Sequence, residues 1–88
     1  MHLRELLGRN IGRLRLASGL SQEDLAHKAK IHRQYAGRIE TGKANASVDT
    51  IQKLAKALRV RPMDLFEPLK LGRLRPPPLK KGPKGPRR

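Results

Sequence analysis

Apolar residues recur every three or four positions through most of residues 1–68, and no segment shows sustained alternation of apolar and polar positions. This spacing is typical of amphipathic helices rather than strands. The apolar stripe of the first segment consists of Leu3, Leu7, Ile11 and Leu14, each about one turn from the next. We therefore expect a first helix over residues 3–18, followed by Gly19 in the left-handed conformation that ends many helices.

Capping residues divide the rest of this region into further helices. Ser21 begins the segment Ser-Gln-Glu-Asp, in which the Ser21 hydroxyl and the Asp24 carboxylate can each pair with an unbonded amide. We expect helices over residues 21–29, 32–41 and 47–58, and a short fifth helix that begins near Pro62. The expected inward-facing residues are Leu25, Ala26, Ala29, Tyr35, Ala36, Ile39, Val48, Ile51, Leu54, Ala55, Leu58, Leu65 and Phe66. The fold class is therefore all-α, a compact domain of five helices.

Charge divides the chain into two parts. Residues 1–68 contain 13 Lys and Arg and all seven acids, a net charge of +6, whereas residues 69–88 contain eight Lys and Arg and no acid. The second part also holds five of the seven prolines. Dense proline and uncompensated like charge oppose packing into a core. We therefore expect a folded domain over 1–68 and a disordered basic Pro/Gly-rich tail over 69–88.

Several protein classes are excluded or disfavoured by composition. The 88 residues include no cysteine, so no disulfide and no cysteine-ligated zinc can stabilise the fold. No apolar run approaches the roughly 20 residues that cross a bilayer, and we expect a cytoplasmic protein. His2, His27 and His32 match no common metal site, and the serines are explained by caps and turns. We expect no metal, no cofactor, no small-molecule ligand and no catalysis. The net charge of +14 favours a polyanionic partner, with nucleic acid first.

The second and third expected helices are joined by too few residues to pack antiparallel. They must cross steeply, as in a helix-turn-helix, where the second helix places its N-terminal half in the major groove of DNA. Arg33, Gln34 and Arg38 lie off the apolar face of that second helix. Arginine can donate two hydrogen bonds to guanine, and glutamine can pair with adenine. The alternative is that these side chains only keep a short helix soluble.

Four segments together resemble the Cro/CI-type (lambda-repressor-like, XRE) helix-turn-helix DNA-binding family. They are Ile11-Gly-Arg-Leu-Arg15, Gly19-Leu-Ser-Gln-Glu-Asp-Leu-Ala26, Arg38-Ile-Glu-Thr-Gly42 and Ile51-x-x-Leu-Ala-x-Ala-Leu58 followed by Val60. Their order and spacing match the family over roughly residues 7–67. The resemblance implies a lambda-repressor-like fold and sequence-specific binding to double-stranded DNA.

The resemblance also implies roles for individual residues. The implied base contacts are Arg33, Gln34 and Arg38, with His32 at the N-terminal edge of the same helix. The implied contacts to the DNA backbone are Gln22, Thr41 and Lys43, and Gln22 is also implied to brace the reading helix. The resemblance further implies an internal ion pair between Arg15 and Glu40. The implied homodimer contacts are Val60, Met63, Phe66 and Leu69.

The chain departs from the family pattern at three places. Lys30 stands where the family usually has glycine between the two crossing helices, and Arg59 replaces the glycine after the fourth helix. The family's proline before the fourth helix is Ala46 here. A residue other than glycine costs about 1 kcal/mol in the left-handed conformation. The shape of the Lys30 turn is therefore open, and we expect marginal stability.

The leading functional interpretation is a transcriptional regulator, of the repressor or controller type, that binds an inverted-repeat operator as a homodimer. Two alternatives come from other classes. One is an antitoxin or adaptor whose domain and tail bind a toxin or another protein partner. The other is a nucleic-acid binder of low specificity that depends on the basic tail.

Overall fold

The computed structural model describes residues 2–68, in which four α-helices and one short 3-10 helix occur and no strand is present. The elements are α1 (Leu3–Ala17), α2 (Gln22–Ala29), α3 (Arg33–Glu40), α4 (Val48–Leu58) and η1 (Pro62–Phe66). The all-α prediction is confirmed, but the fifth element is a 3-10 helix of five residues. The expected tail over 69–88, with Leu69, lies outside the described residues.

Local signals account for where the helices begin and end. The Asp24 amide donates to Ser21 Oγ over 2.9 Å, and the Ser21 amide donates to the Asp24 carboxylate over 3.2 Å. Ser47 begins α4 in the same way by accepting from the Thr50 amide over 3.0 Å. Gly19 follows α1 with a φ of 75°, a backbone angle that glycine adopts without steric cost. These caps are the ones that the sequence predicts.

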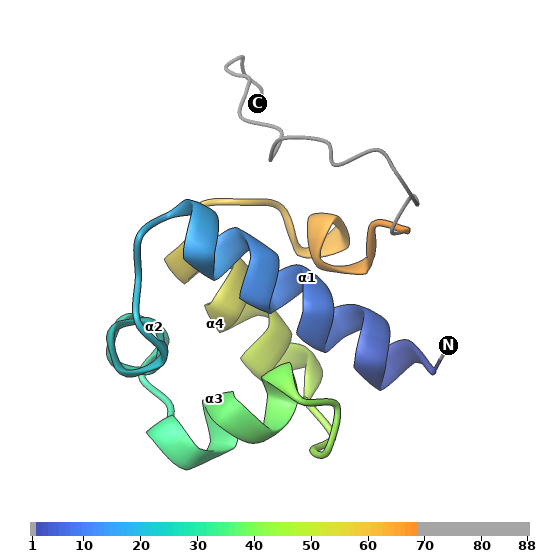
Figure 1. The fold of residues 1–88 in the computed structure, drawn as a ribbon, viewed down its shortest axis with the longest axis horizontal. Coiled ribbons are helices and arrows are strands. Elements are labelled where there is room, and N and C mark those ends of the chain that lie inside the picture. The colour runs from blue at the N-terminus through green and yellow to red at the C-terminus, as the bar shows by residue number, and fades with distance from the viewer. Residues whose placement is uncertain (1, 69–88) are drawn as a thin grey trace.

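Helix α1 lies at the centre of the arrangement (Figure 1). It packs against α3 on one side and against η1 on the other, so the two ends of the domain's sequence lie side by side. Helix α2, seen end-on in Figure 1, packs against α3 and α4, and α4 also contacts η1. The crossing helices α2 and α3 therefore rest on a scaffold of α1 and α4.

The core is aliphatic and draws on every element. Its most deeply buried apolar side chains are Ile11, Leu25, Ile39, Leu54 and Leu65. Two residues expected to face inward do not: Leu3 is 64% exposed and Val48 is 79% exposed. Each is the first residue of its helix, where the helix extends past the edge of the core. Tyr35, Ile51 and Phe66 are only partly buried and cover the core from outside.

Gly8 allows α1 and α3 to approach closely. A Cβ atom on Gly8 would lie 2.6 Å from the carbonyl oxygen of Ile39 and closer still to that of Glu40. Both obstacles are backbone atoms, which cannot move without shifting the end of α3. The contact between these two helices therefore requires glycine at this position.

Candidate nucleic-acid interface

The turn between α2 and α3 keeps the left-handed shape that glycine usually provides. Lys30 has φ 60° and ψ 47°, and its amide donates to the His27 carbonyl over 3.2 Å. The Ile31 amide donates to the Ala26 carbonyl over 3.0 Å, which completes the double hydrogen bond of a Schellman motif. The chain enters α3 two residues later, at Arg33. Lysine thus holds the tight turn that a helix-turn-helix needs, at the steric cost of a side chain in this conformation.

The N-terminal half of α3 presents polar side chains to solvent. His32, Arg33 and Gln34 are exposed, whereas Ala36 and Ile39 on the opposite face are buried against the scaffold. The structure therefore brings three of the four predicted base-contacting residues together at one accessible helix end. These are the side chains that could enter a groove without unpacking the core.

Arg38, the fourth predicted base contact, is exposed but already has a partner. Its Nη2 donates to the Lys43 carbonyl over 3.0 Å and so holds the loop that follows α3. The Thr41 hydroxyl donates to carbonyls at the end of the same helix, with the Gly37 oxygen 3.1 Å away. The Tyr35 hydroxyl donates to the Asn45 carbonyl over 3.0 Å. These contacts place Thr41 and Lys43, the predicted backbone contacts, in a loop braced against α3.

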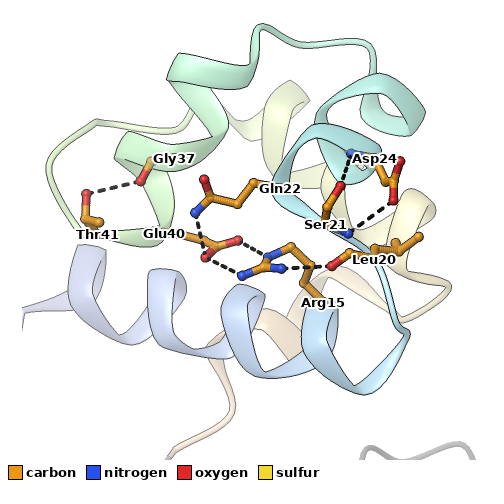
Figure 2. A network of polar contacts seen from close by, with 8 residues as sticks. All are labelled: Arg15, Leu20, Ser21, Gln22, Asp24, Gly37, Glu40 and Thr41. Carbon is orange, nitrogen blue, oxygen red and sulfur yellow. Dashed lines mark hydrogen bonds and ion pairs between the residues drawn. The ribbon is translucent and has the colours of Figure 1, made fainter.

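A polar network behind α3 joins three helices (Figure 2). Arg15 of α1 pairs with Glu40 of α3, with Nε 2.6 Å from Oε2 and Nη2 3.3 Å from Oε1. Gln22 of α2 donates to the same Glu40 carboxylate over 3.1 Å. Arg15 also donates to the Leu20 carbonyl over 2.8 Å. The Arg15 and Glu40 side chains are 14% and 10% exposed, so the ion pair that the resemblance implies is largely shielded from water.

Gln22 points toward this network rather than away from the protein (Figure 2). A Cβ atom on Gly37 would lie 3.4 Å from Gln22 Oε1, an ordinary van der Waals contact, so the packing of α2 on α3 does not require glycine at this position. Glycine inside α3 lowers its helix propensity. The implied phosphate contact of Gln22 stays a prediction, and its contact with Glu40 gives it a bracing role within the protein.

The predicted dimer residues lie at the other end of the domain. Met63 is 67% exposed, and Val60 and Phe66 are partly buried. All three belong to η1 or to the segment that leads into it, on the opposite side of α1 from α3 (Figure 1). The structure thus separates the predicted dimer surface from the predicted DNA surface.

At the N-terminus of α2, the pKa of the Asp24 carboxyl group is lowered. Hydrogen bonds from the Ser21 backbone amide and then from its hydroxyl lower the pKa of Asp24 below its ordinary value of 3.8. The charges of Lys28 and His27 act in the same direction. Asp24 therefore stays ionised and keeps its cap on α2 at neutral pH.

Sequence reasoning missed two residues that build this scaffold. Gly8 was not distinguished from the other glycines, and Asn10 was not singled out although its side chain is fully buried. A signal for Asn10 was present, because a polar residue lies between Leu7 and Ile11 on the apolar stripe. Over residues 2–68 there is no helix long and apolar enough to span a membrane. The same residues contain no group of three or more His, Cys, Asp and Glu that could hold a metal ion.

The steep α2–α3 unit, its exposed polar end and its three-helix support define a DNA-binding transcriptional regulator of the helix-turn-helix class. The chain belongs to the helix-turn-helix family, whose sequence model matches residues 11–65.

This chain is similar in sequence and in structure to several known regulators. Control protein C.BamHI of Bacillus amyloliquefaciens is 43% identical over 67 residues, which cover 75% of this chain and 83% of that protein. The restriction-modification controller protein C.AhdI from Aeromonas hydrophila has a similar structure, with a TM-score of 0.70 and 43% identity over 72% of this chain and 96% of that one. The hypothetical transcription factor NHTF from Neisseria gives a TM-score of 0.74 at 34% identity, over 76% of this chain and 77% of that one.

Proposed function

We propose that this protein is a transcriptional regulator of the restriction–modification controller type, which binds an inverted-repeat operator in double-stranded DNA as a homodimer. The observation that carries the proposal is the exposed N-terminal end of α3, supported from behind by the Arg15–Glu40–Gln22 network. The similarity to control protein C.BamHI and to C.AhdI supports the controller type. The proposal places the protein in the cytoplasm and includes no catalytic step, cofactor or small-molecule ligand.

Arg33 and Gln34 are the residues that we assign to base reading. Both are exposed on the first turn of α3, where a helix inserted end-first into the major groove meets the base edges. Arg33 suits guanine and Gln34 suits adenine. His32 lies at the groove entrance, and Arg38 combines a base or phosphate contact through its free N–H groups with its bond to the Lys43 carbonyl.

The DNA backbone is contacted on both sides of α3. We assign the backbone contacts to Gln22 at the start of α2 and to Thr41 and Lys43 in the loop after α3. The start of a helix favours anions because its first amides have no intrahelical partner. The bonds from Arg38 and Tyr35 brace the loop before DNA arrives, so less conformational entropy is lost on binding.

Two copies are needed because one short helix reads only a few base pairs. Val60, Met63 and Phe66 supply the dimer surface, with Leu69 as the next candidate along the chain. Two α3 helices related by a twofold axis would meet half-sites about one DNA turn apart, roughly 34–36 Å. An inverted-repeat operator follows from that symmetry.

Arg33→Ala tests the base-reading assignment. The variant should lose preference at one base position, at a cost of about 1–3 kcal/mol in binding free energy. Arg9→Ala is the matched control, because Arg9 is an exposed arginine on the α1 surface and has no assigned DNA contact. Competition titrations against single-base variants of the bound duplex would measure both. Equal loss in the two variants, with base preference kept, would show that Arg33 contributes charge only.

Deletion of residues 72–88 separates the proposal from its alternatives. The deleted segment contains seven of the eight basic residues of 69–88, and counterion release from phosphates is independent of sequence. The shortened chain should bind all duplexes more weakly, with a smaller salt dependence and an unchanged base preference. Loss of all affinity would favour the low-specificity binder. A chain without preference among random duplexes would favour the antitoxin or adaptor.

A further inference from the structure

Asn10 is fully buried at the centre of α1 and uses its whole carboxamide. Its Nδ2 donates to the carbonyl oxygens of Leu65 over 3.0 Å and Glu67 over 2.9 Å. Its Oδ1 accepts from Arg13 Nη2 over 3.0 Å. The partners of Nδ2 lie 55 and 57 residues further along the chain. One side chain of α1 thus binds the end of η1 at two points.

The η1 segment cannot hold its own shape without such contacts. It has five residues, far fewer than the roughly 12–15 that an isolated helix needs in water. The backbone bond at its C-terminal end, from the Glu67 amide to the Asp64 carbonyl, is long at 3.4 Å. Its position must therefore be imposed by the surface on which it packs.

Two anchors impose that position, and they do different things. Leu65 is fully buried and attaches η1 to the core, and Phe66 packs against the same core from outside, but apolar contacts are non-directional and do not by themselves fix the rotation of the segment. The Asn10 carboxamide bonds to carbonyls at 65 and 67, and these two directional contacts fix the rotation. Arg13 fixes the carboxamide in turn, because its bond to Oδ1 keeps the NH₂ group toward η1.

We propose that Asn10 is a positioning residue for the homodimer, because its carboxamide sets the orientation of η1 and so of the surface formed by Val60, Met63 and Phe66. This inference rests on the proposed function, in which that surface joins two copies on one operator. Asn10 is fully buried under η1, so its side chain is not accessible to DNA or to a second copy. Its effect on operator binding is therefore exerted through the alignment of the two α3 helices.

Asn10→Asp tests the inference with little change in side-chain volume. A carboxylate cannot donate to the two carbonyls, so it removes the bonds that orient η1. Sedimentation equilibrium of the full chain should show a dimer dissociation constant raised at least about tenfold, equivalent to about 1.4 kcal/mol. Binding should also be measured to two duplexes. The first is the sequence that wild-type protein enriches from a random pool, and the second is the same sequence with one half-site scrambled. Affinity for the intact sequence should fall, and affinity for the scrambled one should stay within about twofold.

Ser47→Ala is the control for general loss of stability. It removes the side-chain cap of α4, which lowers stability, without touching η1. This variant should dimerise as wild type does. The inference is overturned if Asn10→Asp dimerises as tightly as wild type, or if it loses affinity equally for both duplexes. A wild-type protein that stays monomeric would overturn the proposed homodimer itself, which is a distinguishable result.

Arg13→Met decides the question if circular dichroism shows that Asn10→Asp does not fold. It removes the bond that orients the carboxamide, together with one positive charge, and keeps an apolar stem of similar length. The dimer dissociation constant should rise about two- to fivefold, as expected for one modest hydrogen bond, with half-site binding unchanged. An unchanged dimer dissociation constant in this folded variant would overturn the inference.

Discussion

The two sides of α1 hold their neighbours by different chemistry. On the side of α3, Arg15 and Glu40 form an ion pair to which the Gln22 amide adds a hydrogen bond. The Arg15 and Glu40 side chains are 14% and 10% exposed. On the side of η1, a neutral carboxamide that is fully buried makes the connection. A fully buried charge is costly unless every partner is present, whereas a neutral amide can be satisfied by two carbonyls and one donor. The charged contact thus lies where its side chains keep some exposure, the neutral amide lies where burial is complete, and each side can be broken separately.

Breaking the charged side should have the largest effect. Arg15→Ala leaves Glu40 shielded from water with only Gln22 as partner, and the unfolding free energy should fall by about 3 kcal/mol. Urea denaturation would measure this change, with Arg9→Ala as the exposed control. If both variants unfold at the same urea concentration as wild type, the ion pair does not support α3.

The close approach of α1 and α3 should be nearly as sensitive. Gly8→Ala would place a Cβ atom against the backbone carbonyls of Ile39 and Glu40, and should cost about 2 kcal/mol by overpacking. Gly12→Ala is the matched control in the same helix, because its Cβ atom would lie 3.4 Å from a Glu40 side-chain oxygen, which can move. Thermal unfolding should separate the two variants clearly. Equal stability would show that the helices can move apart without cost.

Glycine at Lys30 and Arg59, the two residues other than glycine in the left-handed backbone conformation, should change stability less and in the opposite direction. Lys30→Gly and Arg59→Gly each remove a side chain from a φ near 60°, and should raise the unfolding free energy by up to about 1 kcal/mol. Lys43→Gly, at an exposed loop position outside the left-handed region, should not stabilise the protein. Urea midpoints of the three variants test this. Destabilisation by both glycines would mean that lost side-chain contacts outweigh the relief of strain.

The smallest predicted effect depends on pH. Because the pKa of Asp24 is lower in the folded protein than its ordinary value of 3.8, its contribution to stability is fully present above 3.8. It is lost as the pH falls through the folded pKa. Asp24→Asn should therefore be less stable than wild type at neutral pH, and the difference should shrink below roughly pH 4. If the stability difference between Asp24→Asn and wild type did not change with pH, the ionised Asp24 carboxylate would not be what stabilises the start of α2.

Much of the scaffold could be predicted because its signals are local. The stripe of Leu7, Ile11 and Leu14 depends only on helical spacing, and the Ser21 cap depends on a residue three positions away. The prediction that Leu3 and Val48 face inward was wrong because helical spacing says nothing about where the core ends. The fifth element is a 3-10 helix rather than an α-helix, because the five residues Pro62–Phe66 allow 3-10 hydrogen bonds but no extended α-helix.

The remaining features depend on contacts between distant parts of the chain. Gly8 matters because of the carbonyl of Glu40, and Asn10 because of carbonyls at 65 and 67. Neither partner can be identified from helical periodicity. The Arg15–Glu40 contact could be expected only because the sequence resembles a family in which that pair occurs. The DNA and dimer contacts named from the same resemblance are predictions that the experiments above address.

Selection from a random pool of duplex DNA with the full chain tests the central claim most directly. We expect enrichment of a sequence with two inverted half-sites about one helical turn apart, roughly 10 base pairs. We also expect that Arg33→Ala relaxes one symmetric pair of positions in that sequence, while Asn10→Asp keeps each half-site but lowers recovery of the paired arrangement. A pool that shows no enriched sequence, or a single half-site with no preferred spacing, would contradict it.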